Sequence, residues 1–193
     1  MIKFINNSAN LYLLYREICD PLYLNGPITE SNKVSTSGFL LGGPISQADF
    51  DKAIFAEICL NDNVPVGVIR IDQVSKTFVG DFSLNWVVEK GIRFQAQTVF
   101  ESNNLDSAEL GVIAIHLTHK GKGIGKRLLA DAEKDLKSKG IKHLFSWVGT
   151  NPLNVPSLSF HKKNGFVIVA EYANSDEYGF TPYACTLFYK EIK

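Results

Sequence analysis

A strand, a glycine-rich turn and a helix follow one another in the stretch Ile113–Leu129, which reads IAIHLTHKGKGIGKRLL. The apolar and β-branched residues before the turn are typical of a buried central strand. After the turn, Leu128 and Leu129 begin the apolar face of a helix. A strand that enters a helix through glycines leaves the first N–H groups of the helix without partners. Together with the positive end of the helix dipole, these groups form a binding site for an anion.

The composition of this turn indicates an anion with two phosphates. Gly121, Gly123 and Gly125 carry no side chain, so a phosphate can approach the backbone closely. Positive charge beside these glycines comes from Lys120, Lys122, Lys126 and Arg127. A turn that merely connects the strand to the helix is the alternative.

Two common diphosphate motifs do not fit. A Walker loop needs Gly-x-x-x-x-Gly-Lys followed by Ser or Thr, but Lys120 occupies the first glycine position and Arg127 follows Gly125-Lys126. A dinucleotide fingerprint needs Gly-x-Gly-x-x-Gly, and Lys126 occupies its third glycine position. Some other nucleotide-binding use of the turn stays an alternative.

The turn resembles motif A of the GNAT superfamily of N-acetyltransferases, Arg/Gln-x-x-Gly-x-Gly/Ala, with Lys120, Gly123 and Gly125 in the defined positions. Lys120 keeps the charge of the usual arginine but loses its guanidinium fork. Residues 154–166, NVPSLSFHKKNGF, are similar to motif B of the same family, Asn-x-x-Ser/Ala-x-x-Phe-Tyr-x-x-x-Gly-Phe. The resemblance covers Glu109 to about Tyr172, and the amino-terminal third only by the order of its elements.

The rest of the chain predicts an α/β protein with a single domain over residues 1–193. Hydrophobic periodicity predicts strands at 55–60, 66–71, 110–117, 141–148, 166–172 and 183–192, and helices at 47–54, 124–139 and 157–163. Residues 73–104 mix both periods, and we interpret them as strand-like. The resemblance implies a central mixed, mostly antiparallel sheet that is splayed between two parallel strands and flanked by helices.

The resemblance also implies acetyl-CoA as a co-substrate, bound where the two parallel strands part. A bulge near Ile113-Ala114-Ile115 is expected to free backbone groups for the pantetheine arm. The residues that the resemblance places at the cofactor are Ile115, His116, Leu117, Lys120, Gly121, Lys122, Gly123, Ile124, Gly125, Lys126, Asn154, Ser157 and Phe160. For Asn154 a turn-forming role before Pro156 is the alternative, and for Phe160 a place in the core.

Acyl transfer to an amine needs a base, because the amine must lose its proton before or during attack. Glu109, at the head of the central strand, is the candidate, since the histone-acetylating branch of the family carries a catalytic Glu at a similar distance from motif A. A solvated carboxylate is the alternative for Glu109, and Asp106 and Glu101 are other candidates for the base.

A general acid would protonate the departing CoA thiolate. Many GNAT proteins use the Tyr that follows Phe in motif B, but His161 occupies that position here. Imidazole can carry a proton near neutral pH, so His161 is a candidate acid or thiol contact. Tyr172, Tyr178 and Tyr183 are alternatives.

Charge and composition limit the partners. Twenty basic and twenty acidic residues cancel, so no overall field favours nucleic acid. The chain has no apolar run long enough for a membrane span, no signal-like start and no metal pattern among its three cysteines, and we expect a cytoplasmic protein without a metal.

The resemblance implies as acceptor a primary amine of a small molecule or a protein, and it locates acceptor specificity in residues 20–50 and 73–105. A homodimer is compatible with the sequence. A non-catalytic CoA-binding or regulatory module with the same fold is the competing function.

Overall fold

A mixed sheet dominates the computed structural model, which describes residues 1–6, 9–24, 38–41, 43–74, 84–87, 90–102, 105–174 and 179–193. Its strands are β1 (Ile2–Ile5), β4 (Phe55–Asn61), β5 (Val64–Gln73), β6 (Asn85–Trp86), β7 (Ser107–Ile115), β8 (His143–Asn151), β9 (Val167–Asn174) and β10 (Tyr183–Glu191). They lie in the order β1-β4-β5-β7-β8-β10-β9-β6. Two short parallel strands, β2 (Tyr23–Leu24) and β3 (Leu40–Leu41), form a separate pair.

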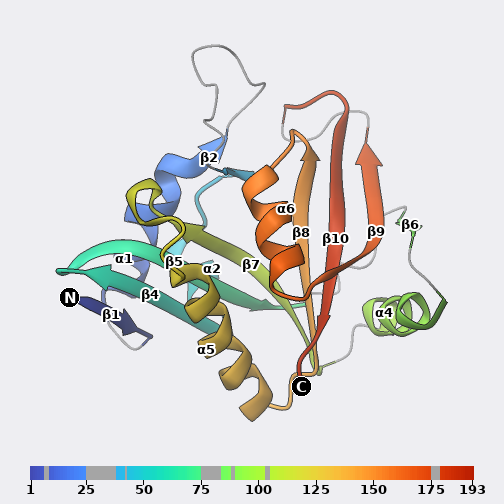
Figure 1. Cartoon of the computed structure of the whole chain (residues 1–193), viewed down its shortest axis with the longest axis horizontal. Helices are drawn as coiled ribbons and strands as arrows, with labels where there is room; N and C mark the ends of the chain where they lie inside the picture. The colour runs from blue at the N-terminus through green and yellow to red at the C-terminus, as the bar shows by residue number, and fades with distance from the viewer. Residues whose placement is uncertain are drawn as a thin grey trace.

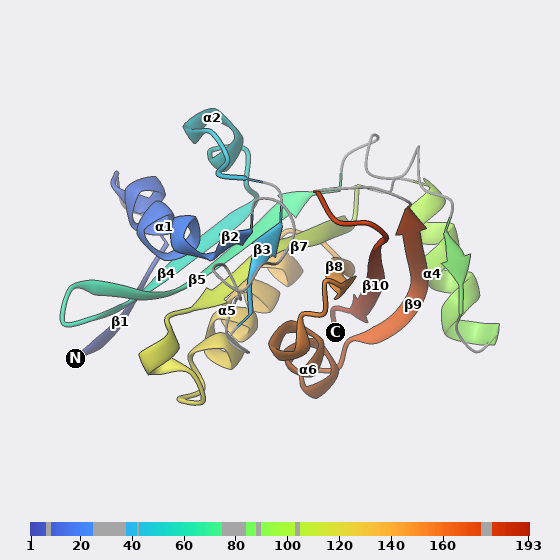
Figure 2. The ribbon, with the colours of Figure 1, turned by 90° about the horizontal axis from the view of Figure 1, so that it is seen from above.

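The helices are α1 (Leu11–Cys19), α2 (Gln47–Phe50), α4 (Lys90–Ser102), α5 (Ile124–Ser138) and α6 (Val155–Lys163), with single 3-10 turns η1 (Asp20–Leu22) and η2 (Leu117–His119). Viewed from above, α1 and α2 lie on one side of the sheet and α5 and α6 on the other (Figure 2). Helix α4 lies at the far end, beside β9 (Figure 1). Among the described residues, no helix is long and apolar enough to cross a membrane.

Strands β7 and β8 are the parallel neighbours in the large sheet, and they separate along their length. Their pairing runs from Ser107 opposite His143 to Glu109 opposite Phe145 and then stops. Beyond that point the two halves of the sheet diverge, with α6 in front of the gap (Figure 1). The expected splay between two parallel strands is therefore confirmed, as is the mostly antiparallel α/β fold.

Alternation along the strands sends side chains into two cores, one on each face of the sheet. On one face, Ile69 and Leu110 pack with Leu128 and Leu136 of α5. On the other face, Val68 and Val112 pack with residues of α1, among them the fully buried Tyr15. Each side chain on β5 and β7 thus points either to the face of the sheet that α5 covers or to the face that α1 covers.

The prediction of strand-like structure over residues 73–104 is wrong for most of the described part. Only Asn85–Trp86 forms a strand there, and Lys90–Ser102 is the helix α4. Ala96, Val99 and Phe100 are buried and lie three or four residues apart, which is a helical spacing. The β-branched and aromatic residues of this segment favoured the strand interpretation, and packing against β9 overrides that preference.

The predicted helix over residues 47–54 is shorter than expected. The Ser46 hydroxyl accepts a hydrogen bond from the Asp49 N–H at 3.1 Å, so Ser46 caps the helix as predicted. The helix ends at Phe50, because the Ile54 N–H already donates to the Ile71 carbonyl at 2.9 Å and so starts the pairing of β4 with β5.

Candidate active site

A cavity of about 840 Å³ lies in the gap between β7 and β8. Its walls come from β7, the turn before α5, β8, α6, the β2–β3 pair and the ends of β9 and β10. This volume is within the range of roughly 300 to 1,000 Å³ that is usual for small-molecule and cofactor sites. The cavity therefore provides room for a bound ligand where the sheet is open.

The turn before α5 presents a row of unpaired backbone donors to this cavity. The Lys120 N–H donates to the Leu117 carbonyl at 3.3 Å, and the Arg127 N–H donates to the Gly123 carbonyl at 3.0 Å. Between them, the structure gives the N–H groups of residues 121–126 no partner among the described residues. Gly121 and Gly123 have φ values of +76° and +79°, a left-handed conformation that favours glycine. The turn is therefore shaped to receive a phosphate-like anion.

Strand β7 also offers backbone groups to the gap. The His116 N–H donates to the Val66 carbonyl at 2.8 Å, so at this position β7 faces β5. Because backbone groups alternate along a strand, those of Ile113 and Ile115 point the other way, toward β8. Since β8 no longer pairs with β7 there, these groups are available to a ligand that lies along the strand.

The bulge expected near Ile113–Ile115 lies instead at Gly111. Val112 pairs with Arg70 and Leu110 pairs with Ile71, which leaves Gly111 as the extra residue. A Cβ at Gly111 would approach Asp72 Oδ2 to 2.3 Å, so a side chain at this position would force the Asp72 carboxylate to move. Asp72 itself is paired with Arg70, whose Nε donates to both carboxylate oxygens at 2.9 Å.

Glu109 is half-buried and lines the cavity at the start of the splay. Burial raises the pKa of Glu109 to about 8, the negative charge of Asp72 raises it too, and the Arg70 guanidinium opposes both. Asp72 is the residue directly opposite Glu109 on β5. A carboxyl group with a pKa near 8 can exchange a proton in the physiological range.

His161 is almost completely buried, with 1% of its surface exposed. Its Nδ1–H donates to the Ser157 carbonyl at 2.7 Å, and its Nε2 lies 2.9 Å from the Ser146 hydroxyl. The same hydroxyl is 3.1 Å from the Leu110 carbonyl of β7. Burial lowers the pKa of His161 to about 4, so the ring is neutral at physiological pH. His161 and Ser146 thus connect α6 to β8 and β7 at the point where the strands separate.

Asn154 uses its side chain to fix the start of α6. Its Oδ1 accepts a hydrogen bond from the Ser157 N–H at 3.2 Å, and its Nδ2 donates to the Phe39 carbonyl at 2.9 Å. Asn154 is buried and at the same time lines the cavity. The residue therefore joins motif B to the segment that leads into β3.

The structure brings most of the sequence-predicted residues to one cavity. Its lining includes Glu109, Ile115, Lys120, Gly121, Gly123, Ile124, Gly125, Lys126, Asn154, Ser157, Phe160 and His161. His116, Leu117 and Lys122 are exposed and do not line it. Glu101 and Asp106, the other candidate bases, are also outside the lining. Tyr172 and Tyr183 line the cavity, while Tyr178 lies outside the described residues.

The two segments expected to set acceptor specificity behave differently. From residues 20–50, the segments around β2 and β3 contribute to the lining. From residues 73–105, none of the residues that the structure describes lines the cavity, because α4 packs on β9 instead. The side of the cavity away from the turn is therefore built by the chain near β2 and β3, together with β8, β9 and β10.

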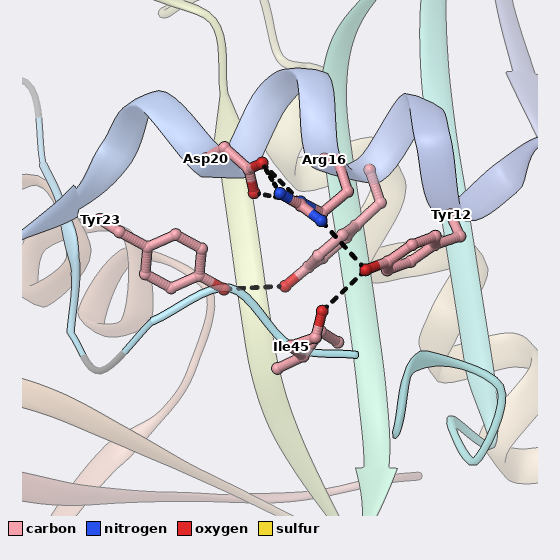
Figure 3. Close-up of polar contacts among 6 residues, drawn as sticks. Tyr12, Arg16, Asp20, Tyr23 and Ile45 are labelled. Atoms are coloured by element: carbon pink, nitrogen blue, oxygen red, sulfur yellow. Dashed lines mark hydrogen bonds and ion pairs between the residues drawn. The ribbon is translucent and has the colours of Figure 1, made fainter. Parts of the chain in front are cut away.

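Helix α1 contacts this side of the cavity (Figure 3). The Tyr12 hydroxyl donates to the Ile45 carbonyl at 2.9 Å, and the Tyr15 and Tyr23 hydroxyls lie 3.2 Å apart. Tyr23 and Ile45 both line the cavity. The Arg16 Nε donates to Asp20 Oδ1 at 2.6 Å and thereby ties the end of α1 to η1.

Sequence reasoning missed Arg70, Asp72, Tyr23, Ser146 and Trp147. One signal for the first two was present, because Arg70 and Asp72 interrupt an otherwise apolar strand two residues apart and so share a face. The other three gave no such signal, since an aromatic residue or a serine on a strand is ordinary.

A sheet that opens between two parallel strands, with unpaired N–H groups at the head of the following helix, agrees with the fold that the resemblance to the GNAT acetyltransferases implied. The family model "Acetyltransferase (GNAT) family" matches residues 44–166. The chain belongs to the GNAT acetyltransferase family. No curated protein matches it by sequence.

Solved structures share the whole fold at low sequence identity. The ribosomal-protein-S18-alanine N-acetyltransferase from Escherichia coli is 14% identical, with a TM-score of 0.60 over 100% of this chain and 95% of that one. The protein smu.2055 from Streptococcus mutans is 14% identical, with a TM-score of 0.65 over 99% of both chains. A GNAT-family acetyltransferase from Streptococcus pneumoniae is 15% identical, with a TM-score of 0.60 over 100% of both chains. At these identities the likeness concerns the fold alone.

Proposed function

We propose that this protein transfers an acetyl group from acetyl-CoA to a primary amine by direct attack of the amine on the thioester. The observation that carries the proposal is the cavity between β7 and β8, which has a row of unpaired N–H groups at one end and Glu109 at its side. Membership of the GNAT family supports the choice of donor. The acceptor amine belongs to a small molecule or to a protein.

The residues present fit the donor. The N–H groups of residues 121–126 suit the pyrophosphate, and the lysines that line the cavity beside them, Lys120, Lys126 and Lys163, supply positive charge. The outward backbone groups of Ile113 and Ile115 suit the amides of the pantetheine arm. When bound, the donor supplies an activated acetyl group, and the protein holds it along the open edge of β7.

Glu109 is the proposed base. A lysine-like amine with a pKa of about 10.4 is neutral in roughly one of 2,500 molecules at pH 7, which costs about 4.6 kcal/mol of barrier. An ordinary glutamate accepts a proton from such an amine only against a large pKa difference. Burial raises the pKa of Glu109 to about 8, which narrows this difference and makes proton transfer to the carboxylate easier.

The other chemical roles fall to the backbone and to His161. An N–H of β7 that faces the gap can donate to the thioester oxygen as negative charge develops there. His161 is a weaker candidate for the acid than its position in motif B suggested, because the ring is neutral and both nitrogens already have partners. We therefore propose that His161 positions β7 and α6, and that the CoA thiolate leaves without a proton from this ring.

A direct experiment tests the proposal. Purified protein is incubated with acetyl-CoA and a panel of primary amines, and release of the free CoA thiol and formation of the acetylated amine are both measured. We expect amine-dependent thiol release that matches the amide formed. Tight CoA binding without amide formation from any amine would instead support the non-catalytic CoA-binding module. A homodimer and a cytoplasmic location stay predictions from the sequence.

A further inference from the structure

The sheet divides the cavity into two sides. Ile113 and Ile115 pack toward the α5 face, where the turn and α6 also lie. Val112 and Ala114 pack toward the α1 face. Arg70 and Asp72 alternate with Ile69 and Ile71, which belong to the α5 face, so their side chains lie on the α1 face, together with the opposed Glu109. The donor's phosphates and the proposed base therefore approach the reaction from opposite faces of the sheet.

The part of the cavity on the α1 face is aromatic and aliphatic. We call it the acceptor lobe and define it by Tyr23, Phe39, Leu41, Trp147, Tyr172 and Tyr183. Phe39, Leu41, Trp147 and Tyr172 pack around the buried Tyr183 and Cys185. The ring centroids of Trp147 and Tyr172 are 6.5 Å apart, and those of Tyr172 and Tyr183 are 6.4 Å apart. Trp147, Tyr172 and Tyr183 thus form a continuous aromatic cluster within the lobe.

Charged side chains are few among the described residues of this lobe. Among the described lining residues, the lysines come from the turn, α5 and α6, on the opposite side of the cavity. The charged lining residues on the α1 face are Arg70 and Glu109, and Glu109 is the one acidic residue that the described lining contains. Arg70 is already neutralised by its ion pair with Asp72. Glu109 is the proposed base, so its carboxylate serves the reacting amine and is not left to pair with a second charge.

We infer that the acceptor is a primary amine on an aromatic or aliphatic body that carries no second charge. The inference rests on the proposed function, because it names the substrate of the same site. An apolar body gains free energy by leaving water for the acceptor lobe. A second ammonium group would be desolvated there without a counter-charge from the described lining residues, and a carboxylate would find the Arg70 guanidinium already occupied by Asp72.

Matched amines test this inference. We compare hexylamine with the diamine of the same chain length, and phenethylamine with phenylalanine, in the assay of acetyl transfer. Each pair differs by one added charge. We expect kcat/KM to be at least about tenfold higher for hexylamine than for the diamine, and for phenethylamine than for phenylalanine, because burying an unpaired charge costs free energy. A preference for the diamine or for phenylalanine would overturn the inference while leaving the proposed transferase activity intact.

A variant of the lobe provides the second arm. Leu41→Asp places a carboxylate among the aromatic residues, and we expect it to raise the ratio of diamine to hexylamine turnover several-fold. Leu41→Asn introduces a side chain of the same shape as Asp but without its charge, and it should leave the ratio of diamine to hexylamine turnover near that of the wild type. Leu13→Asp makes the same change on an exposed residue outside the cavity and serves as the matched control. An unchanged ratio in folded Leu41→Asp would also count against the inference. Failure of every amine in the wild type, with CoA still bound, would overturn the proposed function itself.

Discussion

Asp72 on β5 and Glu109 on β7 are directly opposed residues of an antiparallel pair, and Glu109 lies two residues before the bulge at Gly111. Two acidic side chains in this arrangement repel each other unless one of them is protonated or neutralised. Here the Arg70 guanidinium forms an ion pair with the Asp72 carboxylate, and Glu109 stays largely protonated at neutral pH. The pair thus couples the proposed base to an ion pair that lies at the same cavity.

Glu109→Gln should slow acetyl transfer without weakening CoA binding. A general base typically contributes about 10² to 10⁴-fold, and we expect a loss of about a hundredfold in kcat. The wild-type rate should rise with pH and level off above about pH 8, because only ionised Glu109 accepts a proton. Steady-state rates between about pH 6 and pH 9.5, with calorimetry for CoA, check this. Glu101→Gln, which changes an exposed residue outside the cavity, is the control, and equal rates for Glu109→Gln and wild type would remove Glu109 as the base.

Asp72→Asn should move the pH–rate profile to lower pH. Asp72 raises the pKa of Glu109, and Arg70, released from its partner, would stabilise the ionised form of Glu109 more strongly. Both changes lower the pKa of Glu109, so the rate should level off earlier as pH increases. Rates over the same pH range detect the shift, with Asp62→Asn on the exposed β4–β5 turn as the control. A profile that moves to higher pH would contradict this account of the pair.

Gly123→Asp should abolish CoA binding, because it adds a carboxylate beside the unpaired N–H groups of residues 121–126. We expect affinity to fall by at least about a hundredfold, as for a like charge placed in a binding site. Gly140→Asp is a matched control, since Gly140 follows the C-terminal end of α5 with φ +77°, against +79° for Gly123, and open space surrounds both. Both variants place a side chain at a positive φ and so have the same backbone strain. Calorimetry should show a loss of CoA affinity only in Gly123→Asp. Normal affinity in Gly123→Asp would refute the assignment of the phosphate site.

Glu57→Gln should flatten the dependence of stability on pH. Glu57 lies on β4 with 5% of its surface exposed, and burial raises the pKa of this carboxyl to about 7 from an ordinary value of 4.5. Between these two values the unfolded state gives up its proton before the folded state does, so the folded state loses stability as pH rises from about 4.5 to 7. Denaturant unfolding at about pH 5 and pH 8 should show a wild-type loss on the order of 1 to 3 kcal/mol that is smaller in Glu57→Gln. Glu17→Gln, an exposed change on α1, is the control, and an equal loss in all three proteins would contradict the assignment.

His161→Ala should reduce the free energy of unfolding by about 2 to 4 kcal/mol, because it leaves a cavity and removes the partners of Ser157 and Ser146. Ser146→Ala should cost less, about 1 kcal/mol. His161 is neutral above its pKa of about 4, so it does not change its charge near neutral pH. The pH–rate profile of His161→Gln near neutrality should therefore have the same shape as that of the wild type. If the His161→Gln profile instead lost a rise or fall in rate that the wild type shows near neutrality, His161 would again be the candidate proton donor.

The sequence by itself determined the parts of the site that depend on neighbouring residues. The strand, the glycine turn and the helix of residues 113–129 are local, and glycine at a positive φ and unpaired N–H groups at a helix start follow from short-range geometry. Motif B is likewise a single helix with its cap at Asn154. These two segments were enough to predict the splayed sheet and the family.

Only the tertiary structure decided which residues meet across the sheet. Asp72 and Glu109 are far apart in the chain, and their opposition depends on a register that shifts by one residue at Gly111. The acceptor lobe gathers Tyr23, Leu41, Trp147 and Tyr183 from separate elements, and α4 became a helix through packing on β9. Register and packing are set by contacts between distant segments, and a local pattern does not contain them.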